Sequence, residues 1–228
     1  MIISHKHKFV FLKTKKTAGT SIELALSPIC GDSDILAPLA RSEEALRVQR
    51  GAQNWRLHGW WGGPQPIWKR RWFKFSAQDY GFYNHMPAAE ARALLDDDQV
   101  WRSYFKFAFD RNPWDRQVSF YYQRYRRRPK PPSFEEFLRL DRHARLNNYD
   151  IYSLDGEVCV DFVGRYENLR EDLNYVLRQI GISDRIELPR VKSFTPIRLP
   201  YHAYYNEETR DLVANWYSRE IALLGYAF

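Results

Sequence analysis

A lysine and several small hydroxyl residues follow an apolar run near the start of the chain. Phe9 to Leu12 is continuously apolar, and a helical pattern begins at Ile22. Backbone N–H groups at a helix N-terminus, together with the helix dipole, attract an anion. The residues between would supply a cation, hydroxyls and close backbone approach: Lys16, Thr17, Ala18, Gly19, Thr20 and Ser21. The segment therefore predicts a phosphate cradle, with an ordinary Ser or Thr helix cap as the alternative.

The cradle does not have the spacing of a Walker A loop. That motif, G-x-x-x-x-G-K-[ST], needs a glycine ahead of the lysine, and Phe11 to Lys15 contains none. Hydrolysis of a nucleoside triphosphate is therefore disfavoured as the function.

A second candidate anion site follows a second predicted strand, Tyr104 to Phe109. Arg111 stands at the entry of the next predicted helix, and Ser119 lies two turns further along it. Arg116 is three residues before Ser119, on roughly the same face. A guanidinium and a hydroxyl placed in this way can bind one phosphate. The alternative is a capped helix with a basic, solvated face.

The composition indicates a globular protein with an anionic partner. Of the 228 residues, 44% are hydrophobic, and the net charge of +7 favours an anionic ligand, an anionic surface or nucleic acid. Two cysteines, Cys30 and Cys159, are too few for a disulfide framework, which favours a reducing compartment. Since no apolar run is long enough for a signal peptide or a membrane span, we expect a cytoplasmic protein.

Predicted strands alternate with predicted helices along the chain. Further helices are expected at 42–48, 87–95, 133–138, 167–180 and 207–224, and a further strand at 158–166. This order predicts one α/β domain over residues 1–228, with a mainly parallel sheet flanked by helices. Ligands of such sheets bind beyond the C-terminal strand ends. Both candidate anion sites lie there, so one doubly phosphorylated ligand would contact both.

Two other features bear on the chemistry. The stretch 55–75 interleaves tryptophans with arginines and lysines, a composition that could stack on sugar rings or nucleic-acid bases. Its alternative is a loop whose aromatic rings enter the core. His85 precedes the helix expected at 87–95 and is a candidate base, although a lone histidine is more often structural.

These motifs together resemble the sulfotransferases that use 3′-phosphoadenosine 5′-phosphosulfate (PAPS), in the soluble bacterial-type branch close to carbohydrate sulfotransferases. Lys16–Ser21 is similar to their 5′-phosphosulfate loop, and Arg111–Ser119 to their 3′-phosphate motif. Val163–Leu169 and Gly225–Phe228 are also similar to that branch. The resemblance implies a P-loop-NTPase-like three-layer domain that moves a sulfuryl group from PAPS to an acceptor hydroxyl and releases adenosine 3′,5′-bisphosphate (PAP).

The resemblance also implies roles for single residues. Lys16 would neutralise the leaving 5′-phosphate, and Thr17 to Ser21 would cradle it. Arg111 and Ser119 would hold the 3′-phosphate. His85 would take the acceptor's proton, as the catalytic histidine does in several carbohydrate sulfotransferases. Tyr166 and Arg198 would line the adenine and 3′-phosphate side.

Alternatives remain at several of these positions. The residue before the loop lysine is commonly proline in the family but is Lys15 here, so Lys13, Lys15 and Lys16 compete for the bridging oxygen. His58 is a second candidate base, and Asp79 a third. A nucleotide kinase of related fold and a basic nucleic-acid-binding module are the competing functions. We expect no metal, no specific nucleic acid and a glycan acceptor, with the acceptor's identity and the oligomeric state open.

Overall fold

The computed structural model describes residues 1–49, 81–95, 97–141, 144–183, 186–189 and 199–228. His58, Asp79 and Arg198, together with the aromatic and basic stretch 55–75, lie outside the described residues. Within the described part of the chain, no helix is both long enough and apolar enough to cross a bilayer.

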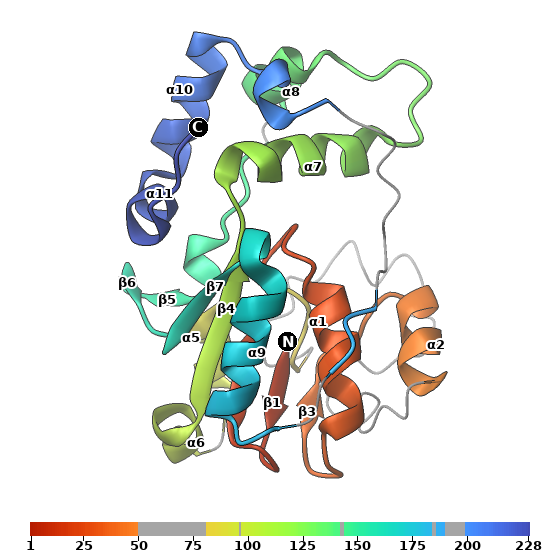
Figure 1. Ribbon diagram of the computed structural model, residues 1–228, viewed down its shortest axis with the longest axis vertical. Coiled ribbons are helices and arrows are strands. Elements are labelled where there is room, and N and C mark those ends of the chain that lie inside the picture. The colour runs from red at the N-terminus through yellow and green to blue at the C-terminus, as the bar shows by residue number, and fades with distance from the viewer. Residues whose placement is uncertain (50–80, 96, 142–143, 184–185, 190–198) are drawn as a thin grey trace, which may run out of the picture.

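A five-stranded sheet forms the centre of the described structure (Figure 1). Its strands, in spatial order, are β3 (Ile35–Leu36), β1 (Ile2–Ser4), β2 (Phe9–Leu12), β4 (Phe105–Asp110) and β7 (Phe162–Arg165). β2 and β4 pair in parallel, as do β4 and β7, whereas β1 is antiparallel to both β2 and β3. All strands except β1 therefore run in one direction, which makes the sheet mixed but mainly parallel.

The described helices lie around this sheet. Their bounds are α1 (Gly19–Leu26), α2 (Arg41–Gln49), α5 (Ala88–Ala93), α6 (Asp98–Ser103), α7 (Pro113–Tyr125), α8 (Phe134–Leu140), α9 (Leu169–Gln179), α10 (Glu207–Trp216) and α11 (Ser218–Leu224). Short 3₁₀ turns are η1 (Ser27–Ile29), η2 (Tyr149–Ile151), η3 (Tyr166–Asn168) and η4 (Tyr201–Tyr204), and β5 (Ser153–Leu154) pairs with β6 (Glu157–Val158) in a separate hairpin.

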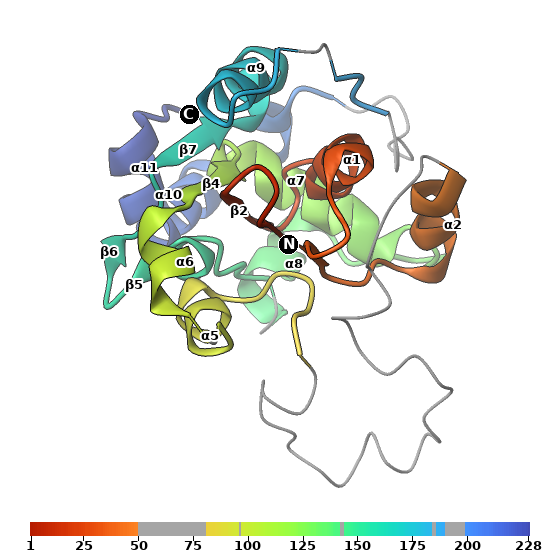
Figure 2. The same ribbon diagram turned by 90° about the horizontal axis from the view of Figure 1, so that it is seen from below.

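Side chains of β2 and β4 alternate between two buried faces. Phe11 and Phe107 stack at 5.1 Å on one face, in the cluster that also contains apolar residues of α1 and α9. Val10 and Ala108 point to the opposite face, in the cluster formed with α5 and α6. Because successive strand residues point to opposite sides, two apolar faces require a helical layer on each side. Figure 2 shows the resulting three layers, with α1 and α9 on one side and α5 and α6 on the other.

A third apolar cluster lies beyond the C-terminal end of β4. Trp114 and Val118 of α7 pack there with residues of α8, α10 and α11 (Figure 1). The parallel register places Leu12 opposite Ala108 and Asp110 opposite Arg165. The turns that follow β2, β4 and β7 therefore meet at one edge of the sheet, beneath this helical cluster.

The α/β prediction is confirmed, with differences at some element boundaries. The helix expected at 207–224 is divided into α10 and α11 at Tyr217, whose backbone leaves the helical region and whose buried hydroxyl bonds to Gln117. The strand expected at 158–166 is shorter, because residue 158 belongs to the β5–β6 hairpin. At α8 the expected capping box is present between Ser133 and Glu136.

Gly164 lies where β7 passes against the buried Phe109 ring. A Cβ added at Gly164 would stand 2.5 Å from Phe109 Cε1, in a core position with no exposed surface to relieve it. We expect Gly164→Ala to lower the free energy of unfolding by about 1–3 kcal/mol, measured by urea denaturation. Gly31→Ala is the matched control, since its nearest neighbour is the flexible Lys6 side chain. Equal losses for the two variants would contradict this explanation.

Candidate active site

The loop between β2 and α1 has the geometry of an anion cradle. Lys16 (φ 66°) and Ala18 (φ 58°) both have left-handed backbone conformations, which non-glycine residues rarely adopt. α1 starts at Gly19, and Ala18 at its N-cap provides no side-chain hydrogen bond. Alternating backbone conformations and an uncapped helix N-terminus direct N–H groups toward a common point. The loop can therefore bind an anion through its main chain.

Buried hydroxyls of the loop form hydrogen bonds that stabilise its conformation. Thr14 donates a hydrogen bond to the Phe109 carbonyl, and the Thr14 and Thr17 hydroxyl oxygens are 2.7 Å apart. Both threonines are buried, as are Thr20 and Ser21 in the first turn of α1. The Thr17 hydroxyl thus faces the protein interior, and the contribution of Thr17 to an anion would come from its N–H.

The three lysines of the loop have different environments. Lys13 is buried and its Nζ lies 2.5 Å from Glu23 Oε2 and 3.1 Å from Asn84 Oδ1. Lys16 is half-buried, and its Nζ donates to Gln123 Oε1 of α7 at 2.8 Å. Lys15 N–H donates to Asn148 Oδ1 at 2.9 Å. Of these ammonium groups, that of Lys13 is directed into the core, and that of Lys16 across the loop toward α7.

Gly19 is required for the path of Lys13. A Cβ at Gly19 would stand 2.6 Å from Lys13 Cγ, so the lysine side chain crosses the start of α1 where only glycine leaves space. Although burial raises the pKa of Glu23, Lys13 and the Met1 amino group lower it to about 2. The Glu23 carboxylate that faces Lys13 is therefore ionised at neutral pH.

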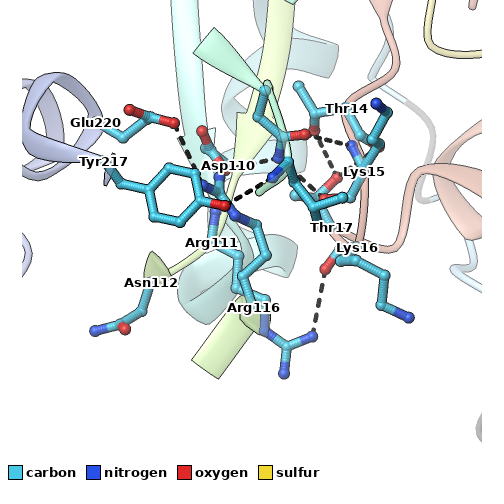
Figure 3. A network of polar contacts seen from close by, with 12 residues as sticks. Thr14, Lys15, Lys16, Thr17, Asp110, Arg111, Asn112, Arg116, Tyr217 and Glu220 are labelled. Atoms are coloured by element: carbon cyan, nitrogen blue, oxygen red, sulfur yellow. Dashed lines mark hydrogen bonds and ion pairs between the residues drawn. The ribbon is translucent and has the colours of Figure 1, made fainter. Parts of the chain in front are cut away.

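Arg111 joins the turn after β4 to this loop. Its NH1 donates to the Lys16 carbonyl at 3.3 Å, and Figure 3 shows the guanidinium directed at that oxygen. Asp115 orients the same guanidinium through Nε and NH2. The guanidinium carbon lies 4.0 Å from the centre of the Tyr166 ring, after β7. Lys16, Arg111 and Tyr166 are thus brought together from three separate strand ends.

Ser119 lies on α7 one turn before Gln123, the residue that contacts Lys16. Residues four apart on a helix share a face, so the half-buried Ser119 belongs to the side of α7 that faces the loop. The predicted residues that the structure describes, apart from His85, therefore all belong to this edge of the sheet: Lys16, Thr17, Ala18, Gly19, Thr20, Ser21, Arg111, Ser119 and Tyr166.

The interpretation of Arg116 as a phosphate ligand is wrong. Its side chain is fully buried, with NH1 2.5 Å from Asp110 Oδ1, NH2 3.3 Å from Glu220 Oε1 and the guanidinium 4.4 Å from the centre of the Tyr217 ring (Figure 3). Burial lowers the pKa of Arg116, but the Asp110 carboxylate outweighs it and raises that pKa overall. Arg116 is a structural cation. Two of its partners, Tyr217 and Glu220, are distant in sequence, so the local pattern around Arg116 did not reveal its burial.

Asn148 is a residue of the site that no sequence motif identified. Its Nδ2 donates to the Lys15 carbonyl at 3.0 Å and to Asp110 Oδ1 at 3.1 Å, while its Oδ1 accepts from Lys15 N–H. Asp110 also accepts from Tyr152 OH at 2.9 Å. A buried amide in an irregular segment carries no periodicity, and only the tertiary contacts reveal its function.

His85 contacts Lys13, at the start of the loop. Its Nδ1 is 3.0 Å from the Lys13 carbonyl, and its φ is 61°. Because a carbonyl only accepts, this contact assigns the proton to Nδ1 and leaves Nε2 as the proton acceptor. Burial and the Lys13 ammonium lower the pKa of His85 to about 4. The imidazole is therefore neutral at pH 7.

The described residues of this region include no cluster of metal-binding side chains. Throughout the described ranges, no group of three or more His, Cys, Asp or Glu side chains is placed to hold a metal ion.

Comparisons with known proteins show the family of the chain. The sequence model of the sulfotransferase family matches residues 1–227. An uncharacterized protein of Archaeoglobus fulgidus is 34% identical over 108 residues, covering 45% of this chain and 88% of that protein. No solved structure matches at a significant level.

Two other relatives carry functional names. Carbohydrate sulfotransferase 11 of Rattus norvegicus is 33% identical over 172 residues, covering 54% of this chain and 49% of that protein. Carbohydrate sulfotransferase 14 of Danio rerio is 29% identical over 161 residues, with 56% and 42% covered. The chain spans about half the length of these two carbohydrate sulfotransferases. Since the family model covers nearly every residue, the chain belongs to the sulfotransferase family.

The burial of Arg116 leads to a prediction about stability. Replacing it with methionine leaves the Asp110 carboxylate buried without its cation, so we expect Arg116→Met to cost about 3–5 kcal/mol of unfolding free energy. Arg127→Met, an exposed change two residues past the end of α7, should cost less than about 0.5 kcal/mol. Chemical denaturation of both variants measures the difference. A stable Arg116→Met protein would show that the pair is dispensable.

Proposed function

We propose that the protein transfers a sulfuryl group from PAPS to an acceptor hydroxyl on a carbohydrate or glycoconjugate. The observation that carries this proposal is the contact between the Lys16 carbonyl and the Arg111 guanidinium. It brings an anion cradle and a second cationic turn to one edge of the sheet. A nucleotide with a 5′-phosphosulfate and a 3′-phosphate has two anionic groups for these two positions. Membership of the sulfotransferase family favours this donor over the kinase and nucleic-acid alternatives.

Donor binding would divide between the two turns. The N–H groups from Thr17 to Ser21 would hold the 5′-phosphate side, because the N-terminus of α1 has no side-chain cap of its own. Lys16 would neutralise the charge that develops on the leaving phosphate. Arg111, oriented by Asp115, would bind the 3′-phosphate with Ser119. Tyr166 would line the adenine side beneath the Arg111 guanidinium.

Bound PAPS would supply the sulfuryl group in an in-line transfer. The bond between sulfur and the bridging phosphate oxygen breaks while a bond forms from the acceptor oxygen to sulfur. His85 Nε2 would take the acceptor's proton, which yields a sulfate ester, PAP and a protonated imidazole. Such transfers depend mainly on positioning and charge stabilisation, as phosphoryl transfers do. The Nδ1 bond to the Lys13 carbonyl would hold the ring in the tautomer that this step needs.

The acceptor class rests on the relatives. Carbohydrate sulfotransferases 11 and 14 match just over half of this chain. The net charge of +7 is compatible with an anionic carbohydrate. We therefore favour a glycan hydroxyl over a small-molecule hydroxyl as the acceptor.

Nucleotide binding tests the donor assignment. Calorimetric titration should give tighter binding of PAP than of AMP, since only PAP reaches Arg111. Arg111→Ala should lose PAP affinity by about 1.5–3 kcal/mol, the typical value of a hydrogen bond to a charged group. It should lose far less AMP affinity, because AMP is affected only through the contact of Arg111 with the Lys16 carbonyl. Lys16→Ala should lower the affinity for both nucleotides.

The control for this titration is Arg127→Ala, an exposed cation with the same charge change. An unaltered protein that binds AMP as tightly as PAP would overturn the donor assignment. A proportional loss of both affinities in Arg111→Ala would show that Arg111 does not read the 3′-phosphate.

The pH dependence of transfer tests His85. With the pKa of His85 lowered to about 4, the base stays unprotonated from pH 7 down to about pH 5, so kcat/KM should fall only as the pH approaches 4. Transfer of labelled sulfate from PAPS to a glycan, measured from pH 4 to pH 8, gives this profile. His85→Asn should lower kcat by about 10²–10⁴-fold.

Acid stability must be measured beside this profile. Unfolded histidine titrates near 6.5, so the lowered pKa of His85 makes the folded protein lose stability as the pH falls from 6.5 toward 4. Glu23, with its pKa lowered to about 2, stabilises the fold fully above 4.5 and progressively less below it. Circular dichroism at each pH separates unfolding from base protonation. A fall in kcat/KM centred near pH 6.5, with the protein still folded, would exclude the lowered pKa of His85.

A further inference from the structure

The Asn148 side chain connects the two turns of the candidate site, the loop at Lys16 and the turn at Arg111. It is fully buried and lies just before η2. Its amide exchanges two hydrogen bonds with the backbone of Lys15, as a neighbouring strand would, at 2.9 Å and 3.0 Å. Its Nδ2 also donates to Asp110 Oδ1 at 3.1 Å. One side chain thus contacts the residue before Lys16 and the residue before Arg111.

Both ends of this connection are fixed. Asp110 is fully buried, where it accepts from Arg116, Tyr152 OH and the Arg111 N–H as well as from Asn148. At the other end, Lys15 is followed by the left-handed Lys16, a conformation that persists only where the surroundings hold it. Asn148 provides those surroundings for the Lys15 peptide groups on both sides.

From these contacts we propose that Asn148 is a positioning residue that sets the separation between the loop at Lys16 and the turn at Arg111. This inference rests on the proposed function, because the two turns would hold the two ends of PAPS. Without Asn148 the loop loses its link to Asp110, and the two half-sites no longer match the fixed spacing of a bisphosphate. A nucleotide with only a 5′-phosphate does not require that spacing.

Only an amide satisfies all three contacts. The position must accept from one N–H and donate to both a carbonyl and a carboxylate. An aspartate would lose both donated bonds and would place a second carboxylate against Asp110. An alanine would leave the partly buried Lys15 N–H and carbonyl without these partners and would remove a donor from the buried Asp110 carboxylate.

The test compares PAP and AMP binding in the full chain with Asn148→Ala. We expect the preference for PAP over AMP to fall by about tenfold or more, as the loss of these three hydrogen bonds can produce, with AMP affinity changed far less. The matched control is Gln117→Ala, which removes another fully buried amide. Gln117 bonds to the Ala144 carbonyl and Tyr217 OH but to neither turn of the site. It should lose stability without losing the preference.

The outcomes separate this inference from the proposed function. If the unaltered protein shows no preference for PAP, the donor assignment fails. If it prefers PAP and Asn148→Ala keeps that preference, or loses both affinities equally, the positioning role is overturned. Should Asn148→Ala not fold, Asn148→Ser retains a small donor and acceptor for the same titration. Failure of both variants to fold would make Asn148 a stability residue and would also overturn the proposal.

Amide hydrogen exchange gives a readout that needs no nucleotide. If Asn148 positions the loop, exchange should rise across residues 14–18 in Asn148→Ala and remain unchanged there in Gln117→Ala. A rise confined to the Lys15 amide, the direct partner of Asn148, would show that the loop holds its shape without this residue and would overturn the proposal.

Discussion

The buried carboxylate of Asp110 is the constraint on which the rest of the structure depends. A charge without exposed surface is tolerated only where donors surround it, and Asp110 has donors from Arg116, Asn148, Tyr152 and the Arg111 N–H. These donors come from α7, from the segment at residues 148–152 and from the turn after β4. A single charge at a strand end therefore fixes the relative positions of these elements.

That constraint explains how strained loop residues are held. Lys16 and Ala18 adopt left-handed conformations that cost energy for residues with a Cβ. The cost is offset by contacts from outside the loop: the Asn148 amide on Lys15 and the Arg111 guanidinium on the Lys16 carbonyl. Successive residues of this kind can direct backbone N–H groups toward one point, which is the geometry that our proposed anion site needs.

A second buried ion pair organises the opposite side of the loop. The Lys13 side chain, directly after β2, reaches Glu23 of α1, and the Lys13 carbonyl accepts the hydrogen bond from His85. One residue thereby brings a positive charge near the imidazole and fixes its tautomer. Gly19 permits this path because any side chain there would meet the lysine. The electrostatics of the candidate base are therefore coupled to the same loop that would hold the donor.

The sequence by itself determined the local units: apolar strands, the small-residue turn, the proline-started helix α7 and the family to which they belong, because periodicity and motif spacing act over a few residues. Only the tertiary structure decided that Arg116 is buried, that Lys13 points inward and that Asn148 supports Lys15. Those outcomes depend on partners far apart in the chain, 104 residues for Arg116 and Glu220 and 133 for Lys15 and Asn148. A buried charge takes whichever partner the fold brings to it, and no local pattern encodes that choice.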